Sequence, residues 1–182
     1  MGLVPTRITI DEFLKRPQRE DEYDEELIDG EVVLFAKPTK GHTEIVSRAL
    51  VKLSPLQEQG FVVCGNVACR LSEDSLPNAD IGVFRRERWD SVDPEDFVRE
   101  APSLAIEVIS PRDQLSQLLR KSELYLAHGA EQVWMINPGT RSIEVLEQGG
   151  ETWEVRDGDS VESYGIKIQV SDLFATPDSN PV

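Results

Sequence analysis

A glutamate interrupts one of the most apolar segments of the chain. In SLAIEVIS, residues 103–110, the alternation of a β-strand places Leu104, Ile106 and Val108 on one face and Glu107 on the other, among apolar neighbours. An unpaired buried carboxylate is costly, so Glu107 should be protonated, hydrogen-bonded, paired with a cation or bound to a metal ion. A structural ion pair would satisfy it. Its place near the carboxyl end of a strand, where open α/β sheets hold their ligands, favours a functional role.

A second carboxylate could work with Glu107. Asp80 begins the short strand predicted at ADIGVF, residues 79–84, and on its own it could equally be a turn residue after Pro77 and Asn78. Two carboxylates on adjacent strands, however, supply the one or two protein ligands that Mg²⁺ usually takes beside water and phosphate oxygens. The pair therefore predicts a site for Mg²⁺ or Mn²⁺.

Lys121 is the third candidate. It follows Leu118 by three positions and precedes Tyr125 by four, which places it at the border of the buried stripe of a predicted helix. From there its ammonium could reach Glu107 and orient an attacking water or offset charge developing on a phosphate. The alternative is a lysine that lies along apolar surface with its charge in water.

Two further residues could support this site. Glu31 ends a predicted hairpin turn and could be a third metal ligand, direct or through water, or simply a solvated turn residue. His42 heads the apolar stripe of a predicted helix. It could assist the chemistry or be a buried hydrogen-bonding residue.

The elements that must position these residues follow from the apolar periodicity. A short helix begins after Thr9 or Asp11, and the Asp29–Gly30 pair predicts the two-residue turn of a β-hairpin. The acidic run 18–26 before that hairpin is interpreted as a solvated loop. Further strands are predicted at 61–72, 79–84, 103–110, 132–137, 142–148 and 151–156, and helices at 37–60 and 113–130.

These elements predict a single α/β domain. The strand at 103–110 has apolar residues on both faces, which is typical of a central strand. With the helix at 113–130 and the strand at 132–137 it should form a right-handed parallel crossover. A chain of 182 residues suffices for one core, so we expect one domain over 1–182, with its core at about 8–175 and a flexible tail at 176–182.

The composition bounds the function. The net charge is -15, which opposes non-specific binding to nucleic acid, although it does not exclude a local basic groove. No apolar run is long enough to span a membrane and the N-terminus does not have the pattern of a signal peptide, so we expect a cytoplasmic protein without membrane contact. Cys64 and Cys69 should be free thiols on opposite faces of one strand.

The order of these features resembles the bacterial Uma family of restriction-endonuclease-like proteins, within the PD-(D/E)XK nuclease superfamily. The resemblance covers about residues 8–175, and the segments that carry it are ELIDGE, a following helix with His42, Asp80, EVISP, the Lys-x-x-x-Tyr spacing at 121–125, and VWMINP. It implies an α/β fold with a restriction-endonuclease-like mixed sheet flanked by helices. To this the sequence adds an N-terminal β-hairpin and a C-terminal antiparallel extension.

The resemblance also implies roles for particular residues. Asp80 matches the first strand acid of the superfamily and Glu107 the second, so both would be catalytic residues and metal ligands. Lys121 would replace a lysine that usually lies two residues after the second acid, where this chain has Ile109. Glu31 matches the acid of the hairpin. Gln117 and Asn137 stand where relatives often carry carboxylates, which we expect to lie near the site.

Three functions follow as expectations. The first is a metal-dependent endonuclease that hydrolyses DNA, with a homodimer implied by the resemblance. The second is a catalytically weakened nuclease-fold module for binding or assembly. The third is hydrolysis of a small phosphate compound in a closed pocket. A nuclease should gather cationic side chains around Asp80 and Glu107, whereas an acidic mouth with scattered cations favours the second function. The candidate cations are Arg7, Lys37, Lys40, Arg85, Arg86, Arg88, Arg112 and Arg120.

Overall fold

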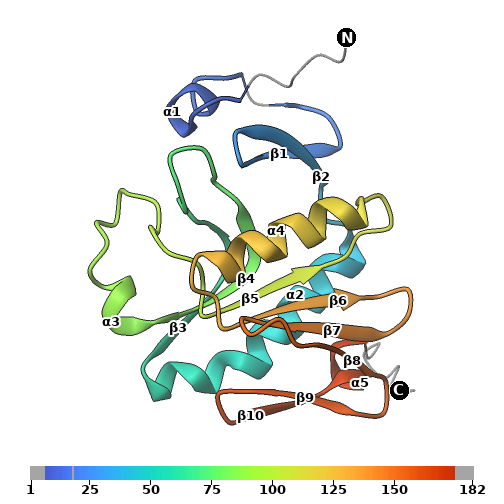
Figure 1. Cartoon of the computed structure of the whole chain (residues 1–182). Coiled ribbons are helices and arrows are strands. Elements are labelled where there is room, and N and C mark those ends of the chain that lie inside the picture. Colours follow the sequence, from blue (N-terminus) through green and yellow to red (C-terminus); the bar gives the residue numbers. More distant parts are fainter. Residues whose placement is uncertain (1–6, 18, 175–182) are drawn as a thin grey trace, which may run out of the picture.

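A six-stranded mixed sheet forms the centre of the fold (Figure 1). The computed structural model describes residues 7–17 and 19–174. The strands lie in the order β3 (Phe61–Ala68), β4 (Asn78–Arg85), β5 (Leu104–Val108), β6 (Gln132–Asn137), β7 (Ser142–Glu147) and β8 (Thr152–Arg156). β5 and β6 pair in parallel around α4 (Leu115–Ala127), which confirms the predicted crossover connection, and the other neighbours in this sheet are antiparallel.

β5 is a central strand, as its two apolar faces predict. All five of its residues are buried. Leu104, Ile106 and Val108 belong to one hydrophobic cluster, and Ala105 belongs to the cluster on the opposite face. Glu107 is therefore fixed on the second face by the alternation of the strand.

Each face of the sheet is covered by its own layer (Figure 1). On one face pack α2 (Lys40–Leu53), the 3₁₀ turn η1 (Ser54–Gln59) and α5 (Val170–Phe174), through residues such as Ile45, Leu53 and Leu173. On the other face pack α4 and the N-terminal hairpin, through residues such as Leu118, Tyr125 and Phe35. The site residues lie where the hairpin, α4 and the sheet meet.

The N-terminal hairpin forms as predicted, but it is longer than expected. It consists of β1 (Tyr23–Ile28) and β2 (Glu31–Ala36), and Asp29 and Gly30 between them both have positive φ. Gly30 is required because a Cβ there would lie 2.8 Å from Cβ of Arg7. The prediction of a solvated loop over 18–26 is wrong for its second half, since residues 23–26 belong to β1.

Short elements complete the chain. α1 (Ile10–Phe13) begins with a capping box formed by Thr9 and Glu12. The sequence analysis did not predict the one-turn helix α3 (Arg86–Trp89) or the two-stranded sheet of β9 (Ser160–Ser163) and β10 (Ile166–Gln169). The predicted tail at 176–182 lies outside the described residues. Within the described part of the chain, no helix is both long and apolar enough to cross a membrane.

The two cysteines are free, as expected, but they do not lie on opposite faces. Both pack with the cluster that contains Phe84 and Tyr125. The reason is Asn66, whose φ of 54° interrupts the alternation of β3 between the two cysteines. Burial raises the pKa of Cys64 to about 11 and that of Cys69 to about 12, so both are unreactive thiols at neutral pH.

Candidate active site

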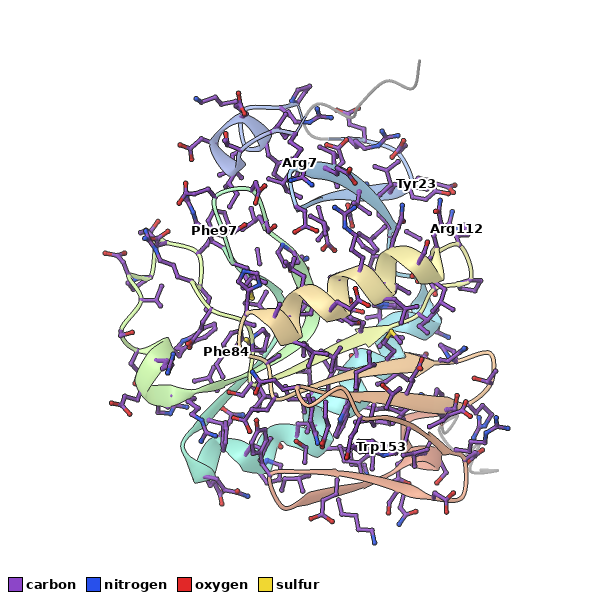
Figure 2. The ribbon with its side chains drawn as sticks, viewed as in Figure 1. Arg7, Tyr23, Phe84, Phe97, Arg112 and Trp153 are labelled. Atoms are coloured by element: carbon purple, nitrogen blue, oxygen red, sulfur yellow. The ribbon has the colours of Figure 1, made fainter. Side chains whose placement is uncertain are left out.

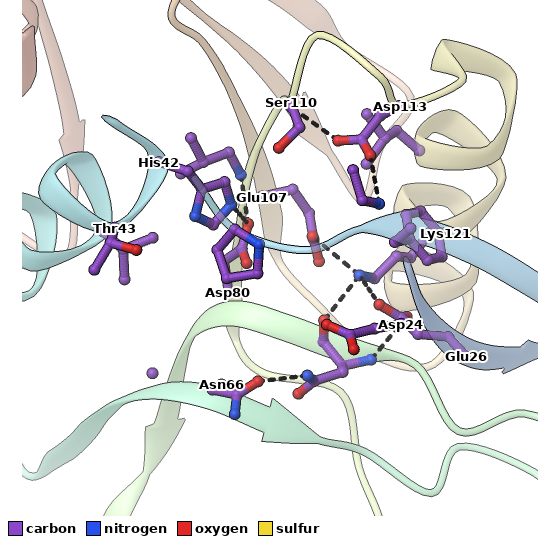
Figure 3. A pocket seen from close by; sticks show the side chains of 18 of the residues that line it. Asp24, Glu26, His42, Thr43, Asn66, Asp80, Glu107, Ser110, Asp113 and Lys121 are labelled. Atoms are coloured by element: carbon purple, nitrogen blue, oxygen red, sulfur yellow. Dashed lines mark hydrogen bonds and ion pairs between the residues drawn. The ribbon is translucent and has the colours of Figure 1, made fainter. Parts of the chain in front are cut away.

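A pocket with a volume of about 390 Å³ lies between the hairpin and the sheet (Figure 3). Its walls come from β1, β2, the first turns of α2, β3, β4, the end of β5 and α4. The acidic residues in these walls are Asp24, Glu25, Glu26, Asp80, Glu107 and Asp113, and the basic ones are His42 and Lys121. The pocket thus brings together four residues that the sequence analysis singled out, namely Asp80, Glu107, Lys121 and His42.

The two carboxylate oxygens of Asp80 differ in their hydrogen bonds. Its Oδ2 accepts hydrogen bonds from the Val108 backbone N–H at 2.7 Å and lies 3.0 Å from Nε2 of His42. Among the described residues no hydrogen bond reaches Oδ1, and the side chain is 26% exposed. The protein therefore fixes the carboxylate through Oδ2 and leaves Oδ1 available to a ligand.

Glu107 repeats this arrangement deeper in the protein. Its side chain is 4% exposed, and its Oε2 accepts a hydrogen bond from Nζ of Lys121 at 3.0 Å. Oε1 is buried and has no hydrogen-bond partner in the described part of the chain. Burial, together with the nearby charges of Asp80 and Glu26, raises the pKa of Glu107 well above its usual value despite the opposing effect of Lys121.

Lys121 is fully enclosed. Its Nζ donates to Oε1 of Glu26 at 2.9 Å, to the Asn78 carbonyl at 2.8 Å and to Oε2 of Glu107 at 3.0 Å, and it lies 4.6 Å from the centre of the Phe35 ring. An ammonium has three donors, so these contacts use all of them. Burial alone would lower the pKa of Lys121, but the surrounding carboxylates outweigh it and raise that pKa.

The position of Lys121 on α4 differs from the prediction. It was expected at the border of the buried stripe, but its side chain is 2% exposed, whereas Leu115 at the start of the helix is 55% exposed. The buried face of α4 is therefore rotated, and Lys121 lies near its centre between Leu118 and Tyr125.

Glu26 is the site residue that the sequence analysis missed. It is 7% exposed, and it accepts from Lys121 through Oε1 and from the Asn78 backbone N–H through Oε2 at 2.9 Å. Burial raises its pKa, although Lys121 works against this shift. The sequence did contain a signal for Glu26. In the register set by the Asp29–Gly30 turn it lies opposite Val33, a core residue of β2.

His42 joins the site from the first turn of α2, where Thr39 caps the helix. Burial would lower the pKa of its imidazole, but the hydrogen bond and charge of Asp80 outweigh this and raise that pKa. Its Nδ1 is buried without a hydrogen-bond partner in the described segments. The contact with Asp80 makes His42 a residue that orients this carboxylate.

Glu31 does not reach the pocket. It binds Arg120 of α4, whose NH1 lies 2.5 Å from Oε2, and Arg120 also contacts Asp29 at 3.1 Å. The Arg120 guanidinium lowers the pKa of Glu31. Ile109, Gln117 and Asn137 are not among the residues that line the pocket either. Asn137 instead accepts hydrogen bonds from the turn after β6.

The expected ring of cations is only partly present. Arg85, Arg86 and Arg88 lie at the end of β4 and in α3, away from the pocket, where they pair with Glu131, Asp90 and Glu100. Arg7 lies at the hairpin turn (Figure 2), and Arg120 holds Glu31. Lys37, Lys40 and Arg112 adjoin wall residues, and Arg112 lies near Tyr23 (Figure 2). The pocket walls are therefore acidic, and these three cations are themselves paired with acids, namely Asp24, Glu44 and Glu22.

The donor set suits a hard divalent cation. Within residues 7–17 and 19–174 no group of three or more His, Cys, Asp or Glu side chains is arranged to hold a metal ion by itself. Mg²⁺ does not need such a group, because it keeps several waters and takes one or two carboxylates beside substrate oxygens. Asp80 and Glu107 offer that number of oxygen ligands, each with an oxygen that no described residue holds.

The mixed sheet and its flanking helices are those of the restriction-endonuclease-like class of folds. The chain belongs to the Uma2 family, whose model is described as "Putative restriction endonuclease" and matches residues 10–171. Among solved structures, that of a "putative nuclease belonging to DUF820" from Anabaena variabilis matches with a TM-score of 0.80 and 25% sequence identity, over 92% of this chain and 97% of that chain. No curated protein matches the chain. The family and the solved structure support a nuclease.

Proposed function

We propose that the chain is a divalent-metal-dependent endonuclease that hydrolyses DNA phosphodiester bonds, with Asp80 and Glu107 as the ligands of Mg²⁺ or Mn²⁺. One observation carries the proposal. The two carboxylates line one pocket, and in each of them the protein holds one oxygen and leaves the other without a partner among the described residues. A divalent cation can be bound by two fixed carboxylates that each have an oxygen without a hydrogen-bond partner.

The residues of the chain have separate tasks in this proposal. Such a cation, when bound, lowers the pKa of a coordinated water and polarises a phosphate oxygen. His42 and the Val108 N–H fix Asp80, and Lys121 fixes Glu107. The carboxylates outnumber the cationic side chains in the pocket, so the site favours an added positive charge.

The approach of DNA is the harder step, because the wall residues are acidic. Bound divalent cations would offset that charge at the centre of the pocket. Lys37, Lys40 and Arg112 have exposed side chains that pair with acidic residues, and they could exchange these partners for flanking phosphates. DNA would then enter from the side of the hairpin and the first turn of α2.

Nicking of a supercoiled plasmid in Mg²⁺ or Mn²⁺ tests the proposal. We expect wild type to relax the plasmid, EDTA to stop the reaction, and Asp80→Asn to lose it, because the amide keeps the size of the side chain but not its charge. Asp172→Asn is the matched control, since Asp172 lies on α5 and pairs with Lys52. Calorimetric titration with Mn²⁺ should show binding to wild type and not to Glu107→Ala. Equal binding by both would refute the metal site.

The acidic mouth favours a second candidate, a nuclease-fold module that binds or assembles without cleaving DNA. Arg85, Arg86 and Arg88 lie together away from the pocket, which also favours this candidate. The same assay separates the two candidates. A wild-type chain that binds Mn²⁺ but leaves the plasmid intact at all metal concentrations would establish the second function.

We also propose that two copies act together, because a duplex has two strands to cut. Trp134 belongs to the core, with 1% exposure, so it is not available for a dimer contact, whereas Trp153 on β8 is 40% exposed. Light scattering coupled to size-exclusion chromatography measures the mass in solution. A monomer at all concentrations would contradict this proposal.

A further inference from the structure

The ammonium of Lys121 has no donor left for a substrate. Its three N–H groups are directed to Glu26, Glu107 and the carbonyl of Asn78, all within 3.0 Å, and the Phe35 ring covers it at 4.6 Å. With 2% of its side chain exposed, it could contact a water or a phosphate only by giving up one of these hydrogen bonds. Direct contact with the reacting groups therefore conflicts with the geometry.

The ion pair with Glu26 explains why the Lys121 ammonium is enclosed. Its two oxygens bind Lys121 and the Asn78 N–H, while Lys121 binds the Asn78 carbonyl. Both backbone polar groups of Asn78 are thus held by one ion pair. Asn78 begins β4 two residues before Asp80, so the same pair that holds Glu107 also fixes the start of the strand that carries Asp80.

Resting on the proposed function, we infer that Glu26 and Lys121 are a positioning pair, which sets the orientation of Glu107 and Asp80 for the metal ion and does not contact the substrate. Glu26 is the essential partner. It holds the lysine at the hairpin side, so that Lys121 takes only Oε2 of Glu107 and leaves Oε1 without a protein partner among the described residues. Outer residues of this kind tune a metal site through its ligands.

Two variants test the inference, with Mn²⁺ alone as the probe in calorimetry. In Glu26→Gln, Lys121 is compensated by Glu107 alone and competes with the metal for it, so the Mn²⁺ affinity should fall ~10-fold or more. Glu31→Gln is the matched control, because it removes the same charge from the same hairpin at a residue that pairs with the neighbouring cation Arg120. It should bind Mn²⁺ as wild type does.

The double variant Glu26→Gln with Lys121→Met removes both charges of the pair, so the net charge of the site does not change. Any loss of Mn²⁺ affinity then reports on positioning and not on charge. The variant also avoids an unpaired buried lysine. We expect its Mn²⁺ affinity to fall ~10-fold or more as well, and plasmid cleavage at saturating Mn²⁺ to return toward the wild-type rate. Wild-type Mn²⁺ affinity with cleavage lost at saturation would show that Lys121 acts directly on the reacting groups, and would overturn the inference.

The failures of the two proposals are distinguishable. If wild type binds no Mn²⁺, the proposed function fails and the inference fails with it. If wild type binds Mn²⁺ and both variants bind it equally well, only the positioning role of Glu26 and Lys121 is refuted.

Discussion

Two neighbouring residues of α4 each hold two carboxylates, one pair inside the protein and the other at its surface. Lys121 binds Glu26 and Glu107 with 2% of its side chain exposed, whereas Arg120 binds Asp29 and Glu31 with 35% exposed. Each cation therefore ties the hairpin to α4. The inner group also contains an oxygen without a partner in the described part of the chain, Oε1 of Glu107.

The same arrangement, one cation between two carboxylates, therefore has different consequences at the surface and in the interior. At the surface, water screens the charges of Arg120 and its partners, so the contact fastens the hairpin at little cost and contributes little energy. In the interior, two carboxylates around one lysine leave an excess negative charge, and Lys121 is the only cation among the described residues that pairs with them. Burial raises the pKa of Glu107 and of Glu26, and nearby carboxylates add to the shift against the opposing effect of Lys121. This excess of negative charge is a reason to expect a metal ion.

The largest effect should come from removing the inner cation. Lys121→Met leaves two buried carboxylates without a cation to pair with, which should cost about 3–5 kcal/mol of the free energy of unfolding or prevent folding. Urea denaturation followed by circular dichroism measures it. A loss as small as that of Arg120→Met would show that the two cations are equivalent after all.

A metal ion should sharpen the contrast by stabilising the inner group alone. At a free Mn²⁺ concentration of 100 times the dissociation constant, mass action predicts a gain of about 2.7 kcal/mol in the free energy of unfolding. Thermal denaturation with and without EDTA measures the gain. Glu31→Gln should retain it and Asp80→Asn should lose it, and the same gain in both would place the metal elsewhere.

Glu107 should make the stability depend on pH. Its pKa in the folded protein is raised above the usual value of 4.5, so its contribution to stability is complete below pH 4.5 and is lost as the pH rises through the folded pKa. Glu107→Gln should remove this loss and gain on the order of 1 kcal/mol at pH 8, since it leaves Lys121 and Glu26 as a neutral pair. Melting temperatures across this pH range check it, and a variant with the wild-type slope would contradict the charge excess.

The smallest effect should come from the outer cation. Arg120→Met should cost about 1 kcal/mol or less, and the cost should shrink further in 1 M NaCl, where charges are screened within about 3 Å. Lys121→Met should keep its full cost in the same salt. An outer contact that resists salt would mean that the hairpin shields it from water.

Much of this site could be predicted from the sequence because strand alternation is strict. The apolar neighbours of Glu107 predict its burial, and the Asp29–Gly30 turn predicts the hairpin. The family resemblance then pointed to Asp80 as its partner. The structure brings both residues to one pocket.

The parts that escaped prediction involve charged residues that a sequence reader assigns to solvent. Glu26 stands in the acidic run EDEYDEE, where composition suggested a loop, and Lys121 was placed at the border of its helix by its spacing from Leu118 and Tyr125. Each is buried because the other compensates it, and these two residues are 95 positions apart in the sequence. Local patterns do not contain that information.

The hairpin is more than a cover for the pocket. β1 and β2 form a sheet of their own, and outside that sheet their described backbone hydrogen bonds are few, among them that from Leu76 N–H to the Leu27 carbonyl. Local opening of this unit would carry Glu26 and Phe35 away from Lys121 without unfolding the central sheet. Assembly of the site and docking of the hairpin are then one cooperative event. Hydrogen exchange of the Leu76 and Asn78 amides, which donate to the hairpin from outside it, becomes a direct measure of how often the site is intact.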